Sequence, residues 1–213
     1  MIKAFIFDLD GVLVDLMSLH EAAFLSALKV VGGLDLGEDV HRARYAGRST
    51  KQKLRQLVEH GLLESDKVDD VATLKQELTG KAILATVHEL PARRYLMEHF
   101  QAGAFKLGCV TNCTKRTAYE VLRRIGVLPY LEAVVTNEDG AAPKPSPEPY
   151  RMVCGLLGVE PKEALVFEDH EVGRTAARLA GCHVQPVHAP PQLTVEFVWE
   201  AIRLAQAYDE ETG

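Results

Sequence analysis

Short apolar runs that stop abruptly at polar residues recur along this chain and alternate with amphipathic segments. The first run, Ile2–Phe7, ends in two aspartates and a glycine, and four later runs also end at polar residues or loops: 107–111, 133–136, 164–167 and 183–187. Segments with helical periodicity, each closed by a glycine, lie at 114–125 and 148–157. This alternation predicts an α/β fold, in which helices cover both faces of a Rossmann-like parallel sheet.

The interval from about 16 to 86 breaks the alternation. Its apolar positions recur with helical spacing near 19–31, 51–60 and 69–84, and none of it has the pattern of a strand. We therefore divide the chain into a discontinuous α/β core, 1–15 and 87–213, and a helical cap, 16–86, inserted after the first strand. We expect the cap to be a mobile lid that closes over bound substrate.

Composition favours a small partner. The 213 residues are 47% hydrophobic, which suffices for a substantial core, and the net charge of −6 gives no general attraction for nucleic acid or an anionic membrane. We expect no nucleic acid and no membrane as a partner. We expect the protein to be a monomer or a weak dimer. No apolar run approaches the roughly 18 residues of a membrane span and no secretory signal precedes the first strand, so we expect a cytoplasmic protein.

The cysteines suggest neither a metal site nor a disulfide framework. Cys109, Cys113, Cys154 and Cys182 form no CxxC pair and show no metal-ligand spacing with the eight histidines. We expect reduced and mostly buried thiols.

Carboxylates follow two of the predicted strands. Asp8 and Asp10 follow the first run, at the end of a strand where open α/β sheets bind ligands, although such a pair also fits a turn whose acids accept local N–H groups. Glu168 and Asp169 follow the run at 164–167. Acids at two strand ends of one parallel sheet repel each other unless a cation joins them. Ligation by oxygen alone favours Mg²⁺.

Two further segments carry candidate chemistry. Thr111 and Asn112 end the second run and offer a hydroxyl and loop amides to an anion, or simply form a polar strand end. Lys144 lies between Pro143 and Pro145. The proline rings restrict the backbone and favour an aimed ammonium group, whereas the alternative is an ordinary solvated lysine.

Taken in order, these segments resemble the four motifs of the haloacid dehalogenase superfamily. The motifs read Asp8-Leu9-Asp10-Gly11-Val12, Thr111-Asn112, Lys144-Pro145-Ser146-Pro147 and Phe167-Glu168-Asp169. Gly173 and the segment 176–181 also resemble the helix that follows the last motif. The resemblance covers essentially the whole core and points to the branch with a helical cap, which includes β-phosphoglucomutase and many small phosphatases.

The resemblance implies a Mg²⁺-dependent phosphatase that acts on a small phosphorylated metabolite. Asp8 would attack phosphorus and form an aspartyl-phosphate. Asp10 would protonate the leaving oxygen and later take a proton from water. Lys144 would neutralise charge, and Thr111 with neighbouring amides and Asn112 would hold phosphate oxygens.

The resemblance also implies a set of metal ligands. Mg²⁺ would be held by Asp8, Asp169 and the backbone carbonyl of Asp10. Glu168 would bind through a water molecule or support the ligands. His170 stands where the family often has serine, and either orients a metal ligand or, the reading we favour, covers the edge of the site.

In the cap, two positions resemble substrate contacts of relatives. His20 matches a common histidine and would contact substrate or stabilise the hinge. The segment Gly47-Arg48-Ser49-Thr50 predicts a helix start capped by Ser or Thr, and Arg48 is either a substrate contact or a solvated arginine. Lys75 and Lys81 lie on a predicted cap helix, where we expect solvated side chains more than ligand contacts.

Alternatives to the phosphatase are a sugar-phosphate phosphomutase and a non-catalytic module that binds a phosphometabolite. Asp10 serves phosphatase and mutase alike, but Thr50 stands where β-phosphoglucomutase has an arginine, which weakens the mutase interpretation. Dehalogenase and phosphonatase relatives lack the second aspartate of the first motif, so Asp10 argues against both. A binding module would be expected to have lost a catalytic group, and none is missing.

Overall fold

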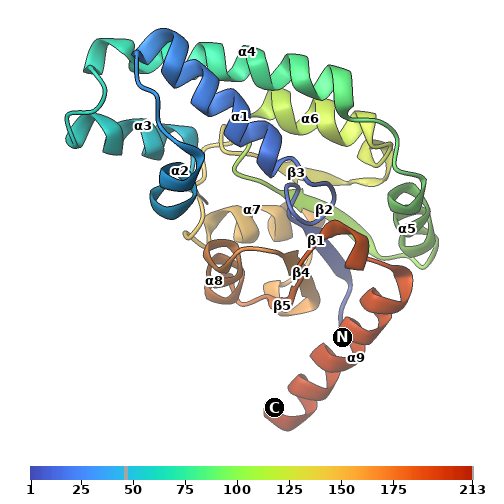
Figure 1. Ribbon diagram of the computed structural model, residues 1–213. Helices are drawn as coiled ribbons and strands as arrows, with labels where there is room; N and C mark the ends of the chain where they lie inside the picture. The colour runs from blue at the N-terminus through green and yellow to red at the C-terminus, as the bar shows by residue number, and fades with distance from the viewer. Residues whose placement is uncertain (46–47, 213) are drawn as a thin grey trace. The chain divides into compact units, whose positions relative to one another are not determined.

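The computed structural model describes residues 1–45 and 48–212 (Figure 1). In this part of the chain, all strands are parallel and form one sheet in the order β3-β2-β1-β4-β5. The predicted α/β class is confirmed, and the strand bounds lie close to the predicted runs. The strands are β1 (Ala4–Phe7), β2 (Lys106–Val110), β3 (Ala133–Val135), β4 (Ala164–Glu168) and β5 (His183–Pro186).

The chain forms two compact units, 1–15 with 88–213 and 16–87. The ranges expected from the sequence are 1–15 with 87–213 and 16–86. Among the described residues the second unit contains helices joined by loops and no strand, and its action as a lid stays a prediction. It contains α1 (Met17–Ala27), the π-helical turn η1 (Leu28–Gly32), α2 (Glu38–Arg44), α3 (Thr50–Glu59), the 3-10 turn η2 (Ser65–Lys67) and α4 (Val68–Thr86).

The first unit carries the sheet and its covering helices. Two helices, α5 and α9, fall where the sequence pattern assigned no element. In α9 the buried residues Val198, Ala201, Ile202 and Ala205 recur with helical spacing, so a signal is present there. The helices are α5 (Pro91–Ala102), α6 (Lys115–Arg124), α7 (Glu148–Leu157), α8 (Glu171–Ala180) and α9 (Val195–Thr212), with 3-10 turns η3 (Leu128–Tyr130), η4 (Pro161–Glu163) and η5 (Pro190–Gln192).

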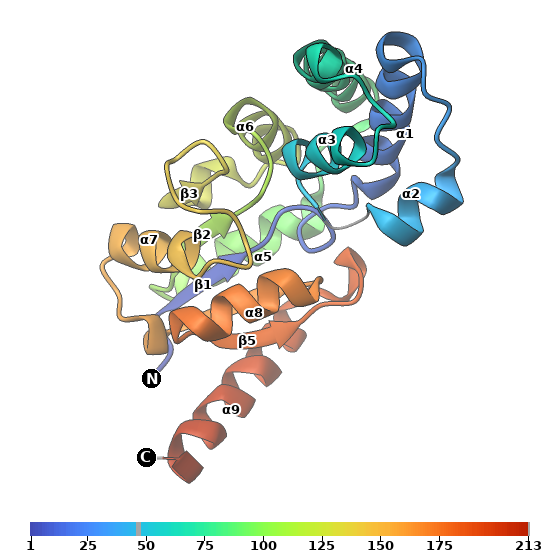
Figure 2. The ribbon, with the colours of Figure 1, turned by 90° about the vertical axis from the view of Figure 1, so that its left-hand side faces the viewer.

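The central strand β1 separates two layers of the core because successive side chains point to opposite faces. Ala4 and Ile6 pack in the cluster that includes buried residues of α7 and α8, which lie side by side in Figure 2. Phe5 packs on the other face, where its ring lies 4.9 Å from that of Phe100 in α5 and 4.6 Å from that of Phe105. Burial on both faces explains why β1 is apolar throughout.

The second unit has a hydrophobic core of its own. Phe24 and Leu28 from α1 and η1 pack with Leu57 of α3 and Val71 of α4. Helices α1 and α4 form the main packing pair of this unit. A separate core is consistent with folding as a compact helical body.

The described helices include none that is both long and apolar enough to cross a membrane. All four cysteines lie in the described part of the chain, and none of them forms a disulfide. Cys113 is half-buried, and the other three are buried. The sulfur atoms of Cys154 and Cys182 lie 3.9 Å apart.

Candidate active site

The two acidic pairs lie at the carboxyl ends of β1 and β4, which are neighbouring parallel strands in register. Phe7 pairs with Phe167, and the Asp8 amide donates to the Phe167 carbonyl over 3.0 Å. The strand order reverses at this point, since β2 lies on one side of β1 and β4 on the other. Asp8 and Glu168 are thereby placed where open α/β sheets bind ligands.

Lys144 joins the two strand ends. Its Nζ atom donates to Asp8 Oδ1 over 2.6 Å, to Glu168 Oε1 over 2.5 Å and to the Val110 carbonyl over 3.0 Å. Only 5% of the Lys144 surface is exposed. The alternative of a solvated surface lysine is therefore excluded. The Asp8 carboxylate accepts a hydrogen bond from the Lys144 ammonium. The alternative of a turn in which Asp8 accepts only local N–H groups therefore does not describe this residue.

The charges at this site are unbalanced. Burial raises the pKa of Asp8 well above its ordinary value, and Lys144 opposes this rise only in part. Burial and then Glu168 raise the pKa of Asp169. Burial by itself lowers the pKa of Lys144, but the carboxylates of Asp8 and Glu168 outweigh it, so the pKa is raised and Lys144 stays charged. The environment therefore favours added positive charge.

The donor set suits a hard divalent cation. Carboxylate oxygens of Asp8, Glu168 and Asp169 all lie within 4.8 Å of one another. When ionised, these three carboxylates carry two more negative charges than the single ammonium of Lys144 offsets. Oxygen donors and this residual charge fit Mg²⁺. Glu168 also bonds Lys144 and Tyr150, so it is the most tightly tied of the three.

Two glycines let the backbone approach the acidic groups closely. Gly11 has φ +92°, and a Cβ atom there would lie 2.2 Å from Asp169 Oδ2. A Cβ atom on Gly173 would lie 1.9 Å from Glu168 Oε1. Both distances are far below van der Waals contact, so these positions require glycine if the carboxylates are to stay in place.

We expect Gly173→Ala to displace the Glu168 carboxylate from Lys144, to lower the free energy of unfolding by about 1–3 kcal/mol, and to reduce kcat at least about tenfold. Gly155→Ala is the matched control, because a Cβ atom on Gly155 in α7 meets nothing within 4 Å. That variant should gain about 0.5–1 kcal/mol of stability and keep its kcat. Thermal unfolding and steady-state kinetics measure both. A fully active Gly173→Ala protein would contradict the assigned packing.

Asp10 lies in a tight turn directly after β1. The Leu13 and Val14 amides donate to the Leu9 carbonyl over 3.0 and 3.2 Å, and the Gly11 amide donates to the Val14 carbonyl over 2.7 Å. The Asp10 residue is half-buried and its side chain is outside the group of converging carboxylates. A separate place for this carboxylate is what proton transfer requires. The Asp10 carbonyl as a metal ligand stays a prediction.

Thr111 and Asn112 lie at the end of β2. The Thr111 amide donates to the Val135 carbonyl over 2.9 Å, and the Cys113 amide donates to Thr111 Oγ1 over 3.1 Å. These two amides are therefore used within the protein. The Asn112 carbonyl accepts a bond from Asn137 Nδ2 over 2.8 Å. Within the described part of the chain the Thr111 hydroxyl accepts one hydrogen bond and donates none, so it stays the candidate anion contact of this segment.

Two residues that touch the acidic group were not found from the sequence. The Tyr150 hydroxyl, from α7, donates to Glu168 Oε1 over 2.6 Å, and its ring centroid lies 5.2 Å from Lys144 Nζ. Arg174 donates to the Asp169 carbonyl over 2.7 Å. Helical periodicity marks Tyr150 as a buried residue of α7 but does not show that its hydroxyl reaches a carboxylate.

His170 begins helix α8. Its side chain accepts a hydrogen bond from the Val172 amide over 3.3 Å, with Nδ1 as acceptor, and the residue is exposed. The imidazole therefore takes the place of the usual Ser or Asp cap. Capping of α8 is neither of the two roles considered from the sequence, orientation of a metal ligand and the favoured coverage of the site's edge, which stay predictions.

In the second unit, Lys75 is buried, and the expectation of a solvated side chain is wrong. It lies on a stripe of α4 that repeats every fourth residue with Val71, Thr79 and Ile83, and only 7% of its surface is exposed. Lys75 Nζ lies 3.3 Å from His20 Nδ1. Burial and then Lys75 lower the pKa of His20 to about 3, so this imidazole is neutral at physiological pH. Lys81 is exposed, as expected.

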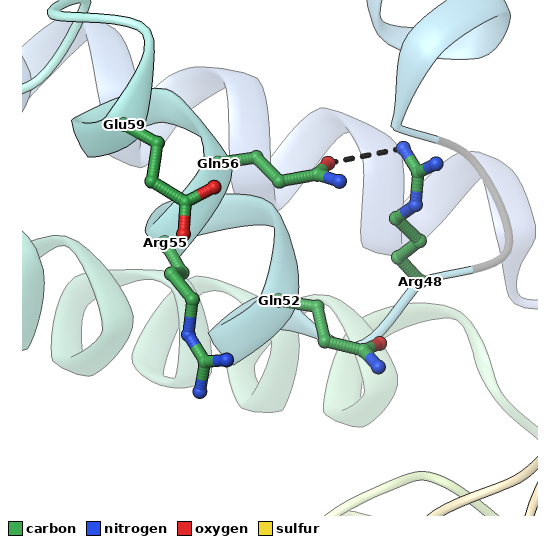
Figure 3. A pocket seen from close by; sticks show the side chains of 5 residues that line it. All are labelled: Arg48, Gln52, Arg55, Gln56 and Glu59. Atoms are coloured by element: carbon green, nitrogen blue, oxygen red, sulfur yellow. Dashed lines mark hydrogen bonds between the residues drawn. The ribbon is translucent and has the colours of Figure 1, made fainter.

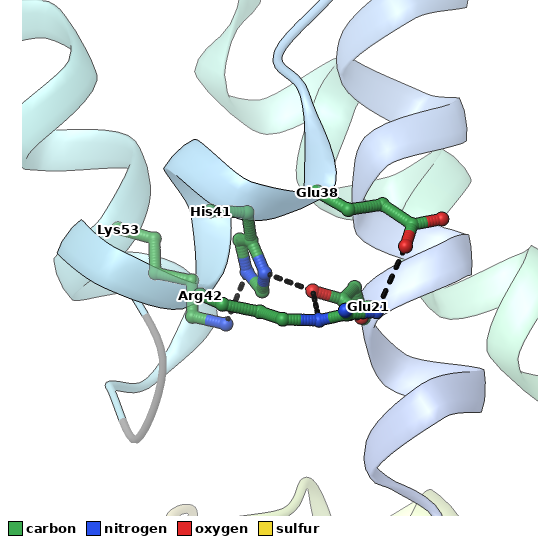
Figure 4. A network of polar contacts seen from close by, with 5 residues as sticks. All are labelled: Glu21, Glu38, His41, Arg42 and Lys53. Atoms are coloured by element: carbon green, nitrogen blue, oxygen red, sulfur yellow. Dashed lines mark hydrogen bonds and ion pairs between the residues drawn. The ribbon is translucent and has the colours of Figure 1, made fainter.

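A polar network connects α1, α2 and α3 in the same unit (Figure 4). Lys53 Nζ lies 2.9 Å from His41 Nε2, and His41 Nδ1 lies 2.9 Å from Glu21 Oε1. Arg42 bridges Glu21 and Glu38. Burial and then Lys75 lower the pKa of Lys53 to about 8. The sequence did not single out Lys53 because one lysine on a helix gives no burial signal.

Arg48 lies just before α3 and is exposed. It donates to Gln56 Oε1 over 3.0 Å and to the Arg44 carbonyl. Ser49 caps α3 and forms a reciprocal capping box with Gln52. Gly47 lies outside the described residues. Arg48 also lines an open pocket of about 230 Å³ with Gln52, Arg55, Gln56 and Glu59. Figure 3 shows these five side chains, and none of the converging carboxylates is among them.

Residues 5–187 match the family model of haloacid dehalogenase-like hydrolases. The chain is 32% identical to the phosphorylated carbohydrates phosphatase of Thermotoga maritima, over 84% of this chain and 82% of that protein. It is also 32% identical to hexitol phosphatase A of Escherichia coli, over 88% and 84%. The structure resembles that of β-phosphoglucomutase from Clostridium difficile, with a TM-score of 0.81 at 23% identity, covering 98% of this chain and 99% of that one.

The fold, the acidic group and these matches define the class: the chain belongs to the haloacid dehalogenase-like hydrolases. It is an enzyme of the phosphatase type within that family. The predicted resemblance and the prediction of an enzyme are thereby confirmed. The phosphoglucomutase likeness lies below 25% identity and therefore supports the fold only.

Proposed function

We propose that this protein is a Mg²⁺-dependent phosphatase that cleaves phosphate monoesters of small sugars or related metabolites through a phosphorylated Asp8. One observation carries the proposal. The buried Asp8 carboxylate lies 2.6 Å from the Lys144 ammonium and within 4.8 Å of two further carboxylates, at the switch point of the sheet. A nucleophile, a fixed cation and hard oxygen ligands therefore share one place.

Asp8, Asp169 and Glu168 are the residues that would hold Mg²⁺, Glu168 directly or through water. When bound, the ion would neutralise negative charge on the phosphate and on Asp8, which otherwise repel each other. Lys144 offsets charge from the other side and holds Asp8 Oδ1, so the nucleophile is oriented before substrate binds. The Tyr150 hydroxyl holds the Glu168 carboxylate on which Lys144 depends.

Asp8 would form a bond to phosphorus while the bond to the leaving oxygen breaks. Asp10 in its protonated form would give that oxygen a proton, which an alcohol leaving group needs. Asp10 would then accept a proton from the water that cleaves the acyl phosphate and returns Asp8 to its carboxylate form. The Thr111 hydroxyl would donate to a phosphate oxygen that is not transferred.

The substrate class rests on relatives. The names of two phosphatases, each 32% identical to this chain, concern phosphorylated carbohydrates and hexitols. In this proposal the unit 16–87 acts as the cap, and Arg48 and His20 are its candidate substrate contacts. A screen of phosphorylated metabolites with Mg²⁺, read out as inorganic phosphate, tests the class. Activity confined to compounds without a phosphate monoester would contradict it.

A phosphomutase is the second candidate because two lysines, Lys53 and Lys75, lie near the neutral imidazole of His20 in the unit 16–87. A mutase must hold a second phosphate, and the two ammonium groups suit that anion. Thr50, which stands where β-phosphoglucomutase has an arginine, favours the phosphatase.

We expect net hydrolysis when sugar 1-phosphates are supplied with a catalytic amount of the matching bisphosphate. Product analysis should show inorganic phosphate formed at least about tenfold faster than the 6-phosphate, since a mutase must keep water from its intermediate. Lys53→Met, which removes one of the gathered cations, shows whether any isomerisation depends on the second-anion contact. Faster formation of the 6-phosphate in the unaltered protein would establish the mutase instead.

A further inference from the structure

We propose that Arg93 is a positioning residue for Asp10: it fixes the turn after β1 and thereby the carboxylate that protonates the leaving group. This inference rests on the proposed role of Asp10. Arg93 lies in the first turn of α5, far along the chain from the motifs, and only 7% of its surface is exposed.

The Arg93 guanidinium bonds backbone carbonyl groups from two other parts of the first unit. Nε donates to the Leu13 carbonyl over 3.2 Å, and one terminal nitrogen donates to the Leu193 carbonyl over 2.6 Å. The other terminal nitrogen donates to the Pro190 carbonyl. Among the described residues no carboxylate pairs with Arg93. Three of its five N–H donors are therefore used to hold backbone carbonyl groups.

The Leu13 carbonyl belongs to the turn that contains Asp10. Backbone bonds within 9–14 close this turn, and Asp10 forms an isolated bridge with Val14. Leu13 itself is fully buried, so its carbonyl is shielded from bulk water and is bonded by Arg93 instead. Arg93 is the contact that ties this turn to α5 and, through Pro190 and Leu193, to the turn η5.

The place of Arg93 in the chain strengthens the inference. Leu13 lies three residues before the second unit begins, and Arg93 lies six residues after it ends at Val87. Within the first unit, one side chain therefore links the segment that ends at Asp15 with the segment that begins at His88. Arg93 also occupies the buried stripe of α5 with Leu96, Met97 and Phe100, where an apolar residue would serve packing alone.

A purely structural role predicts a different kinetic result from a positioning role. Loss of folded protein lowers the rate for every substrate by the same factor. A displaced Asp10 slows only reactions whose leaving group must be protonated: an alkyl phosphate needs that proton, whereas an aryl phosphate releases a stable phenolate without it. Because kcat/KM includes only the steps up to departure of the leaving group, the ratio of kcat/KM for alkyl over aryl phosphate isolates this effect.

The test compares this ratio in Arg93→Met and in the unaltered enzyme, with glycerol phosphate and 4-nitrophenyl phosphate as probes. We expect the ratio to fall about a hundredfold, because a displacement of a catalytic group by about 1 Å can lower the rate by about that factor. Arg94→Met is the matched control, because Arg94 is the exposed neighbour that pairs with Glu89 and Glu98, and its ratio should not change. Arg93→Gln, too short to reach all three carbonyls, replaces Arg93→Met if that variant does not fold.

The Asp10→Asn variant separates the inference about Arg93 from the proposed acid role of Asp10. It should lower the same ratio at least as far as Arg93→Met does. If Asp10→Asn lowers the ratio while the folded Arg93 variants keep it within about twofold of the unaltered enzyme, Arg93 is only structural and the inference is overturned. If Asp10→Asn itself leaves the ratio unchanged, the acid role of Asp10 is wrong and the inference falls with it.

Discussion

Replacing Asp8 with asparagine is expected to lower kcat at least about a thousandfold while the protein stays folded. The amide is a poor nucleophile and a weaker ligand for a hard cation. Lys144 keeps Glu168 and the Val110 carbonyl as partners, so the buried ammonium is not left unsatisfied. Steady-state phosphate release on the best substrate, with circular dichroism as the check on folding, measures the effect.

Asp69→Asn serves as the control for this variant, because Asp69 is an exposed aspartate at the start of α4. Its kcat should stay within about twofold of the unaltered enzyme, as for most surface substitutions. More than a tenth of the original activity in a pure preparation of Asp8→Asn would end the covalent mechanism.

Removal of divalent cations is expected to abolish turnover, and Mg²⁺ to restore it. Carboxylates of Asp8, Glu168 and Asp169 converge within 4.8 Å against one ammonium, so an anionic phosphate meets net repulsion unless a cation is added. Ca²⁺ should inhibit, because it takes a larger and looser oxygen shell and would misplace Asp8 for in-line attack. Chelation, metal analysis and titration of each cation, followed by phosphate release, test this directly.

A second readout keeps the metal prediction independent of activity. Mg²⁺ should raise the melting temperature of the unaltered protein, since an ion that binds only the folded state stabilises it. Asp169→Asn should weaken this shift, whereas Asp139→Asn, which alters a carboxylate that pairs with Lys115, should keep it. Full activity in protein shown to be free of metal would refute the metal requirement.

The strands of the sheet were predictable because each strand carries its own signal. Short apolar runs that end in polar residues mark β1 and β4 as strands, whereas the structure alone shows that these two strands are neighbours. Helix α5 gave a weaker signal, since Arg93 interrupts its apolar stripe. A charged residue whose partners are backbone carbonyls distant in sequence cannot be distinguished from a surface arginine by periodicity.

The candidate site shows the same limit. The sequence identified Asp8, Lys144 and Glu168 by their types and their places after strands, but it did not predict that Lys144 bonds both acids. Tyr150 was missed because a tyrosine in a helical stripe is usually a core residue. Lys75 was expected to be solvated for the corresponding reason, since burial of a lysine depends on tertiary neighbours such as His20.

The most direct test of the account is to trap the phosphorylated enzyme. Asp10→Asn should still form an acyl phosphate from 4-nitrophenyl phosphate, because this leaving group needs no proton, and should hydrolyse it slowly for want of a base. Acid quenching within the first turnover, followed by peptide mapping, should place one phosphoryl group on Asp8. Stoichiometric release of 4-nitrophenol with Asp8 unmodified, or with the phosphoryl group on another residue, would contradict the central claim.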